Sequence, residues 1–168
     1  YGRAEEILLK GKKFFNENIK KTTGDYCILI SNLALVYLRT GQYSKGLKLA
    51  LSVENDMVKL LGEAHPSYFA LLSNIGQFLL ETSEPAKALP YSKKAKNLYE
   101  KYGNKDLNYP MAINNLGVNY YSLRFYDKAL TCMEEAMEVY RKFEYAPMLY
   151  SALANLGSAF GKLGETKK

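Results

Sequence analysis

The chain has 168 residues, of which 48% are hydrophobic and 24% charged, and its formal net charge is +6. This length and composition predict one folded domain with a substantial core and argue against a disordered chain. No run of about 18 apolar residues occurs, so we expect no membrane span, and no signal-peptide pattern opens the sequence. The two cysteines, Cys27 and Cys132, form neither a disulfide framework nor a CxxC motif, which favours a reducing compartment and a cytoplasmic location.

Apolar residues spaced by three and four predict helices along the whole chain. Glycine and proline mark the helix boundaries: Gly62 and Gly103 follow the ends of two predicted helices, and Pro66 and Pro110 lie at the starts of the next ones. Pro90 falls inside a predicted helix, where we expect it to kink the helix or delay its start. The predicted helices span residues 2–18, 26–39, 43–60, 67–81, 85–102, 109–123, 126–143 and 147–162.

The predicted helices belong to an internal repeat. A small residue recurs in every second helix at separations of 42, 42 and 41 residues, as Ala4, Gly46, Ala88 and Ala129. An asparagine recurs in every first helix at separations of 42, 41 and 40 residues, as Asn32, Asn74, Asn115 and Asn155. The two independent markers recur with nearly the same separation, which shortens slightly along the chain. We therefore define repeat units of about 1–25, 26–67, 68–108, 109–146 and 147–168.

Both ends of the chain fall inside a repeat. The chain opens on a second helix, because Tyr1 aligns with Tyr43, and it closes on a first helix, because residues 163–168 align with residues 40–45. We therefore expect a single array over residues 1–168, made of a leading half-repeat, three full repeats and a trailing first helix. A native solenoid end usually carries a polar capping helix, and neither end shows one. This predicts that the array is a fragment of a longer protein.

The helix pair between residues 113 and 136 shows the pattern of the repeat most clearly. A large apolar residue is followed by Leu-Gly, a tyrosine, an alanine and two further core residues, in the order Ile113, Leu116, Gly117, Tyr120, Ala129, Met133 and Ala136. This pattern resembles the tetratricopeptide (TPR) repeat, and weaker copies of it cover the rest of the chain. The resemblance implies an all-α, right-handed α-solenoid of TPR helix pairs.

The length of the repeats points to a subtype. They are 40 to 42 residues long, whereas the common TPR has about 34. The loop from Leu61 to Pro66, which contains His65, resembles the linker of the long repeats found in kinesin light chains. Other linkers keep only the proline of this His-Pro pair, at Pro110 and Pro147.

The resemblance also places the charges. In TPR arrays the first helix of each pair lines a concave groove and the second faces outward. Arg39 and Glu81 are the only charged residues within residues 26–40, 68–83 and 109–123, so the groove is nearly neutral. It therefore lacks the inward Lys and Arg of a carboxylate clamp for chaperone tails. The lysines lie mainly on second helices, which favours a solvated convex face over nucleic-acid binding, since the latter needs basic and aromatic residues interleaved on one surface.

The repeated asparagines define the candidate site. One asparagine in each first helix predicts a row along the groove, where each amide can donate to and accept from the backbone of an extended peptide. The alternative is that each asparagine bonds a neighbouring helix and stabilises the stack, and the two roles are compatible. The candidate groove residues are Asn32, Leu35, Arg39, Asn74, Gln77, Asn115, Val118, Asn119, Tyr121 and Asn155.

Catalytic chemistry has no support in the sequence. We assign the single histidine, His65, to ordering or capping a loop, because no nucleophile or base accompanies it. Metal-ligand spacing, a phosphate-binding loop and a nucleophile elbow are lacking, so we expect no enzyme activity, no metal and no cofactor. We expect a module of a scaffold or adaptor that binds a protein or peptide ligand. The alternatives are a regulatory or substrate-recruiting region of a larger enzyme and, less favoured, nucleic-acid binding through the basic convex face.

Overall fold

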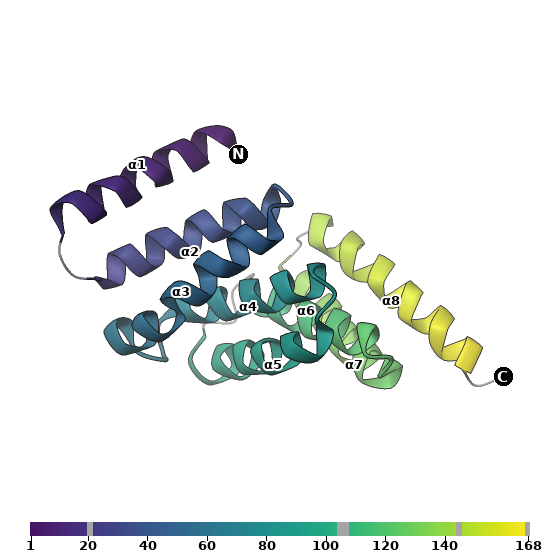
Figure 1. Ribbon diagram of the computed structural model, residues 1–168. Helices are drawn as coiled ribbons and strands as arrows, with labels where there is room; N and C mark the ends of the chain where they lie inside the picture. The colour runs from purple at the N-terminus through teal and green to yellow at the C-terminus, as the bar shows by residue number, and fades with distance from the viewer. Residues whose placement is uncertain (20–21, 104–107, 144–145, 167–168) are drawn as a thin grey trace.

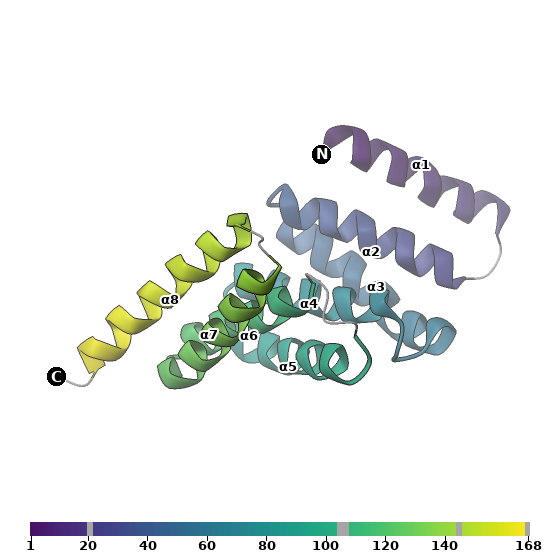
Figure 2. The same ribbon diagram turned by 180° about the vertical axis from the view of Figure 1, so that it is seen from behind.

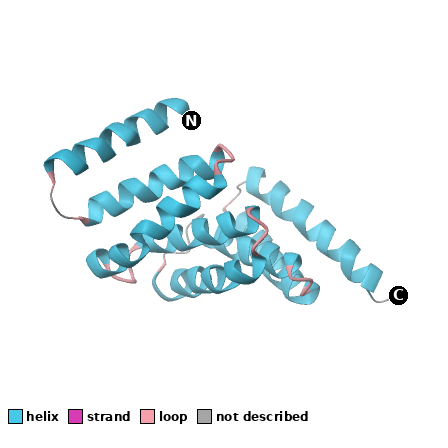
Figure 3. Cartoon of the chain, viewed as in Figure 1, coloured by secondary structure: helices cyan, strands magenta, loops and turns pink. Residues whose placement is uncertain are grey.

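The computed structural model describes residues 1–19, 22–103, 108–143 and 146–166, and within them it contains eight α-helices and no strand (Figures 1 and 3). The helices are α1 (Gly2–Asn18), α2 (Gly24–Arg39), α3 (Tyr43–Leu61), α4 (Pro66–Glu81), α5 (Pro85–Tyr102), α6 (Asn108–Ser122), α7 (Tyr126–Lys142) and α8 (Ala146–Thr166). The predicted all-helical fold is confirmed. None of the described helices is both long and apolar enough to cross a membrane.

The helices stack as an elongated solenoid of pairs. The pairs are α2 with α3, α4 with α5 and α6 with α7, and each second helix also contacts the first helix of the next pair. The first helices α2, α4, α6 and α8 contact one another in sequence, so they form a continuous layer. Helices α1 and α8 lie at opposite ends of the stack (Figures 1 and 2).

The turn within each pair repeats one geometry. Gly41, Ser83 and Arg124 follow the first helix with positive φ angles of 73°, 61° and 64°. The next residue donates its backbone N–H to a carbonyl of the last helical turn at 2.9, 2.7 and 2.9 Å, which is the Schellman motif. Only Gly41 adopts this left-handed conformation without a steric cost, because Ser83 and Arg124 carry a Cβ.

Helix α8 departs from this pattern. It continues to Thr166 through the position where the alignment predicts a turn, so the predicted helix end at residue 162 is wrong. In the other pairs a second helix packs back on the first, and no helix follows α8 within the described residues. Because no second helix covers α8 in the described residues, its Leu153 and Phe160 are 40% and 51% exposed. Ile113 of α6, the equivalent of Leu153, is fully buried.

Small residues bring the paired helices together, as the repeat pattern predicts. A Cβ on Gly117 of α6 would lie 2.9 Å from Cγ of Met133 and 3.3 Å from the carbonyl oxygen of Ala129, both in α7. A Cβ on Gly46 of α3 would lie 3.1 Å from Cβ of Tyr37 in the paired helix α2, and 2.3 Å from the ring of Phe78 in α4 of the next pair. These contacts are too short for a larger residue, so the glycines set the distance between the helix axes.

Two local expectations have opposite outcomes. Pro90 does not delay the start of α5, which begins at Pro85 and continues to Tyr102, so a delayed start is wrong and a kink at Pro90 stays a prediction. The capping role of His65 is confirmed, since its Nδ1 accepts a hydrogen bond of 3.2 Å from the backbone N–H of Ser67 at the start of α4.

The two cysteines are packing residues. Cys27 lies in α2 and Cys132 in α7, and both are buried free thiols. Burial is the main cause that raises the pKa of each thiol above its ordinary value, which disfavours the reactive thiolate. Both cysteines therefore act as small hydrophobic side chains within the core.

Candidate functional site: the groove along the first helices

A cavity of about 310 Å³ opens on the layer of first helices. It lies at the C-terminal ends of α2 and α4 and along α6 and α8, with one residue from α7. Its lining residues are Arg39, Gln77, Leu80, Glu81, Met111, Asn114, Asn115, Val118, Tyr140, Ser151 and Asn155. Five of the ten predicted groove residues are therefore brought together in one cavity, from four successive first helices.

Four amide side chains line this cavity, and two of them, Gln77 and Asn115, make no hydrogen bond within the described residues. Asn155 Nδ2 of α8 donates a long hydrogen bond of 3.4 Å to Asn114 Oδ1 of α6. Asn115 is partly buried, yet in the described part of the chain its side chain makes no hydrogen bond, and the same holds for Asn74 and Asn32. An amide has two donor and two acceptor positions, so these asparagines keep their bonding capacity for another molecule.

Four other predicted residues lie outside this cavity. Asn32 is exposed, and Leu35, Asn74 and Tyr121 are partly buried. The ring of Tyr121 packs against Tyr126 of α7, with centroids 5.6 Å apart. Tyr121 therefore lies near the turn between α6 and α7, beyond the end of the cavity.

Asn119 is placed differently from the prediction. It is fully buried, and its Nδ2 donates a hydrogen bond of 2.9 Å to the carbonyl of Pro85 at the start of α5. Its side chain therefore ties two repeats together instead of lining the groove, and its assignment to the groove is wrong. The repeat alignment could have predicted this burial, because the positions equivalent to Asn119 hold the apolar residues Val36 and Phe78, which are both buried.

Glu81 and Asn114 line the cavity but were not among the ten candidate residues, although the sequence already placed Glu81 as one of two charges on the first helices. Glu81 is the repeat equivalent of Arg39, 42 residues later, and the two share the same cavity. Asn114 precedes Asn115 and takes the place of the buried serines Ser31 and Ser73 in the earlier repeats. Alignment within the repeat could have found both residues.

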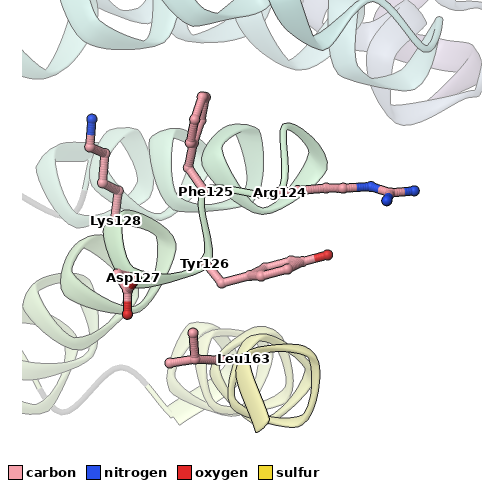
Figure 4. Close-up of a pocket in the computed structure, with 6 residues that line it drawn as sticks. All are labelled: Arg124, Phe125, Tyr126, Asp127, Lys128 and Leu163. Atoms are coloured by element: carbon pink, nitrogen blue, oxygen red, sulfur yellow. The ribbon is translucent and has the colours of Figure 1, made fainter. Parts of the chain in front are cut away.

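A second cavity, of about 380 Å³, lies at the turn between α6 and α7 (Figure 4). Its lining residues are Arg124, Phe125, Tyr126, Asp127, Lys128 and Leu163. Figure 4 shows Phe125 and Lys128 extending to the same side, Arg124 extending to another side, and Leu163 of α8 below Tyr126. The ammonium group of Lys128 lies 5.5 Å from the centre of the Phe125 ring and 5.8 Å from that of Tyr120. Because this lysine is engaged by aromatic rings and none of the repeated asparagines lines this cavity, the groove is the better candidate.

Two lysines of α5 are engaged by neighbouring side chains. Lys94 donates a hydrogen bond of 2.9 Å to the hydroxyl of Tyr68 and contacts Glu63 at 3.1 Å, and these two contacts raise the pKa of Lys94. Lys96 pairs with Glu100 and Glu135 at 2.5 and 3.6 Å. These two lysines therefore have less charge to offer phosphates.

The same cluster ties α5, α6 and α7 together. The hydroxyl of Tyr109, at the start of α6, is placed 3.0 Å from Glu135 and 3.3 Å from Glu100. Burial, followed by its hydrogen bond to Glu135, raises the pKa of Tyr109 above its ordinary value. Within the described residues, no group of three or more His, Cys, Asp or Glu side chains is arranged to hold a metal ion.

Comparison with known proteins identifies the repeat. Two family models, both described as tetratricopeptide repeat, match residues 25–101 and 111–142, and together they span more than half of the chain. No curated protein matches the chain significantly.

Solved structures share the fold at low identity. BtubC (BKLC) from P. vanneervenii superposes with a TM-score of 0.79 at 20% identity, covering 98% of this chain and 70% of that one. The nearly identical TPR-like repeats of a putative Podosopora anserina kinesin light chain give 0.72 at 17% identity, covering 82% and 67%. A Rap protein complexed with competence and sporulation factor gives 0.76 at 16% identity, covering 98% and 46%. The predicted resemblance to kinesin light chain repeats is confirmed at the level of fold.

Proposed function

Since the chain belongs to the tetratricopeptide repeat family, we propose that it is a non-catalytic module that binds a peptide segment of a partner protein in the groove along α2, α4, α6 and α8. Repeats of this family build protein–protein interaction modules. The observation that carries the proposal is the set of asparagines at the groove whose amides have no hydrogen-bond partner in the described chain, with Asn115 inside the cavity.

The chemistry of the cavity suits a peptide backbone. An amide side chain binds a peptide N–H and a peptide C=O at once, whatever the peptide's sequence. Each such hydrogen bond contributes about 0.5–1.5 kcal/mol net. Leu80, Met111 and Val118 add apolar surface beside the amides, so a peptide also gains contacts for its side chains.

A similar solenoid gives independent support. The Rap structure was solved in complex with competence and sporulation factor, so a solenoid of this fold is able to hold a bound factor. At 16% sequence identity the similarity supports a common fold and does not identify the ligand of this chain. We place the module in a cytoplasmic scaffold or adaptor.

A second candidate function is recruitment for a larger enzyme. The chain spans less than half the length of the two Rap structures that it resembles, 44% and 46%. An array of this length can therefore form one part of a larger protein. In that arrangement the groove would bind a substrate or regulator for a catalytic domain outside residues 1–168.

The test is the removal of the groove amides. Peptides that bind the chain are first selected from a random-peptide display library, and their affinity is measured by fluorescence anisotropy. Asn115→Ala should weaken binding by about two- to tenfold, since it removes one or two net hydrogen bonds. The double variant with Asn74→Ala should bind more weakly still.

The control is Asn97→Ala on α5, an exposed asparagine on a second helix, which should leave peptide affinity unchanged. Melting curves followed by circular dichroism separate the two roles of the asparagine row. Unchanged melting with weakened binding supports the ligand role, whereas a lower melting temperature with unchanged affinity assigns the asparagines to the helix stack and contradicts the proposal.

A further inference from the structure

Two opposite charges stand out in an otherwise neutral groove. Arg39 and Glu81 occupy equivalent positions of α2 and α4, both are exposed, and both line the 310 Å³ cavity. In the described residues neither side chain takes part in an ion pair, with the other or with any third group. Helix α6, which supplies more of the lining residues than any other helix, contributes no charge. Each of the two charges is therefore available to a ligand.

Glu81 also breaks a local rule of helix stability. It is the last residue of α4, where the carbonyl ends of the helix carry partial negative charge and disfavour a carboxylate. No basic residue lies in the last turn of α4 to offset this effect. Arg39, by contrast, lies at the favourable end of α2. Residues that oppose local stability without compensation are expected at functional sites, so Glu81 points to a role in binding.

The separation of the two charges follows from the helix stack. Helices α2 and α4 are in direct contact, and packed helices have axes about 8–10 Å apart. An extended peptide advances by about 3.3 Å per residue. A peptide that crosses the ends of both helices therefore passes Arg39 and Glu81 about three residues apart.

We propose that the groove selects peptides with one acidic and one basic side chain about three residues apart, the acidic one opposite Arg39 and the basic one opposite Glu81. The inference rests on the proposed peptide-binding function and adds a sequence requirement to it. The asparagines bind the backbone of any extended peptide, and the two charges determine which peptide sequences bind more tightly. The peptide binds in one direction, so peptides with the two charges in the reverse order are rejected.

The experiment compares peptides selected from one random-peptide display library by four forms of the chain. These are the wild type, Arg39→Glu, Glu81→Lys and the double reversal Arg39→Glu/Glu81→Lys. We expect the wild type to enrich paired acidic and basic residues at a fixed short spacing. Arg39→Glu should lose the acidic preference, Glu81→Lys the basic one, and the double variant should enrich the two charges in exchanged positions.

Matched charge reversals on the convex face serve as controls. Lys59→Glu on α3 and Glu138→Lys on α7 change exposed residues of second helices and should enrich the same peptides as the wild type. A wild-type peptide should bind Arg39→Glu or Glu81→Lys about three- to tenfold more weakly, and added salt should shrink this difference. Glu81→Lys should melt no lower than the wild type, so its lost binding cannot come from unfolding.

The outcomes distinguish a failure of the charge requirement from a failure of the proposed peptide-binding function. If no peptide is enriched by the wild type under conditions that recover a control ligand for a control protein, the peptide-binding function fails and the charge requirement with it. If peptides are enriched and depend on Asn115 but show no charge pair, or show one that the reversals do not change, the charge requirement alone is overturned. Enrichment that follows the reversals supports both.

Discussion

Gly117 and Gly157 occupy the same position of the repeat but have opposite surroundings. Gly117 lies in α6, where an added Cβ would meet Met133 and the carbonyl of Ala129 in α7. Gly157 lies in α8, and nothing lies within 4 Å of the Cβ that would be added there. We therefore predict that the same change, glycine to alanine, has opposite effects on the free energy of unfolding at the two positions.

The magnitudes follow from two competing effects. Alanine favours a helix interior over glycine by about 1 kcal/mol, and this gain applies at both positions. At Gly157 nothing opposes it, so Gly157→Ala should raise stability by about 1 kcal/mol and the melting temperature by about 2–4 °C. At Gly117 the new methyl overpacks the helix pair, which costs about 1–3 kcal/mol. Gly117→Ala should therefore be neutral or lower stability by up to about 2 kcal/mol.

The assay is thermal and urea unfolding of both variants beside the wild type, followed by circular dichroism. Sedimentation of the wild type at the same concentration establishes that the chain is monomeric in the assay. If Gly157→Ala destabilises the monomer as much as Gly117→Ala does, the outer face of α8 is packed against other parts of the chain, and the explanation of its exposed Leu153 and Phe160 is refuted.

Two further predictions concern the turns and the cluster around Tyr109. Ser83→Gly should raise stability by about 0.5–1 kcal/mol, because it relieves a left-handed residue at φ 61°; a drop in melting temperature would contradict the Schellman geometry of this turn. Tyr109→Phe should lower stability by about 1–3 kcal/mol, because a carboxylate loses its buried donor. Because the pKa of Tyr109 is raised in the fold, its contribution is complete below the ordinary tyrosine pKa of about 10 and is lost as the pH rises toward the folded value. Urea titrations across that alkaline range should show a steeper loss of stability for the wild type than for Tyr109→Phe.

The fold could be predicted from the sequence because each helix pair repeats the same local rules. The spacing of Gly46, Ala88 and Ala129 set the repeat, and Gly62, Pro66 and Pro85 marked helix ends close to where they lie in the structure. The end of α8 could not be predicted in this way. A helix ends where tertiary packing supports the turn, and the local sequence around Gly164 matches Gly41 without that support.

The candidate site was harder to predict, because periodicity gives the face of a helix only approximately. Asn115 and Asn119 differ by one helical turn in sequence, yet Asn115 lines the cavity and Asn119 is buried against the start of α5 in the preceding pair. The cavity itself spans four helices from separate repeats, so no local pattern describes it. The sequence places Arg39 and Glu81 on separate first helices, and the packing of α2 against α4 brings both to one cavity.

The repeat separates structural polar residues from those left for a ligand. Where one copy has a polar residue and the others have buried apolar ones, as at Asn119 with Val36 and Phe78, the fold uses the polar group itself, here in the bond to Pro85. Where every copy keeps the same polar residue and the described chain offers it no partner, as at Asn74 and Asn115, the repeat holds a bonding group that the fold does not use. The position of Arg39 is a third case, because it changes from Arg39 to Glu81 to Ser122 along the stack. A constant amide row beside a variable charged row is the arrangement expected of a groove that binds any peptide backbone and selects among side chains.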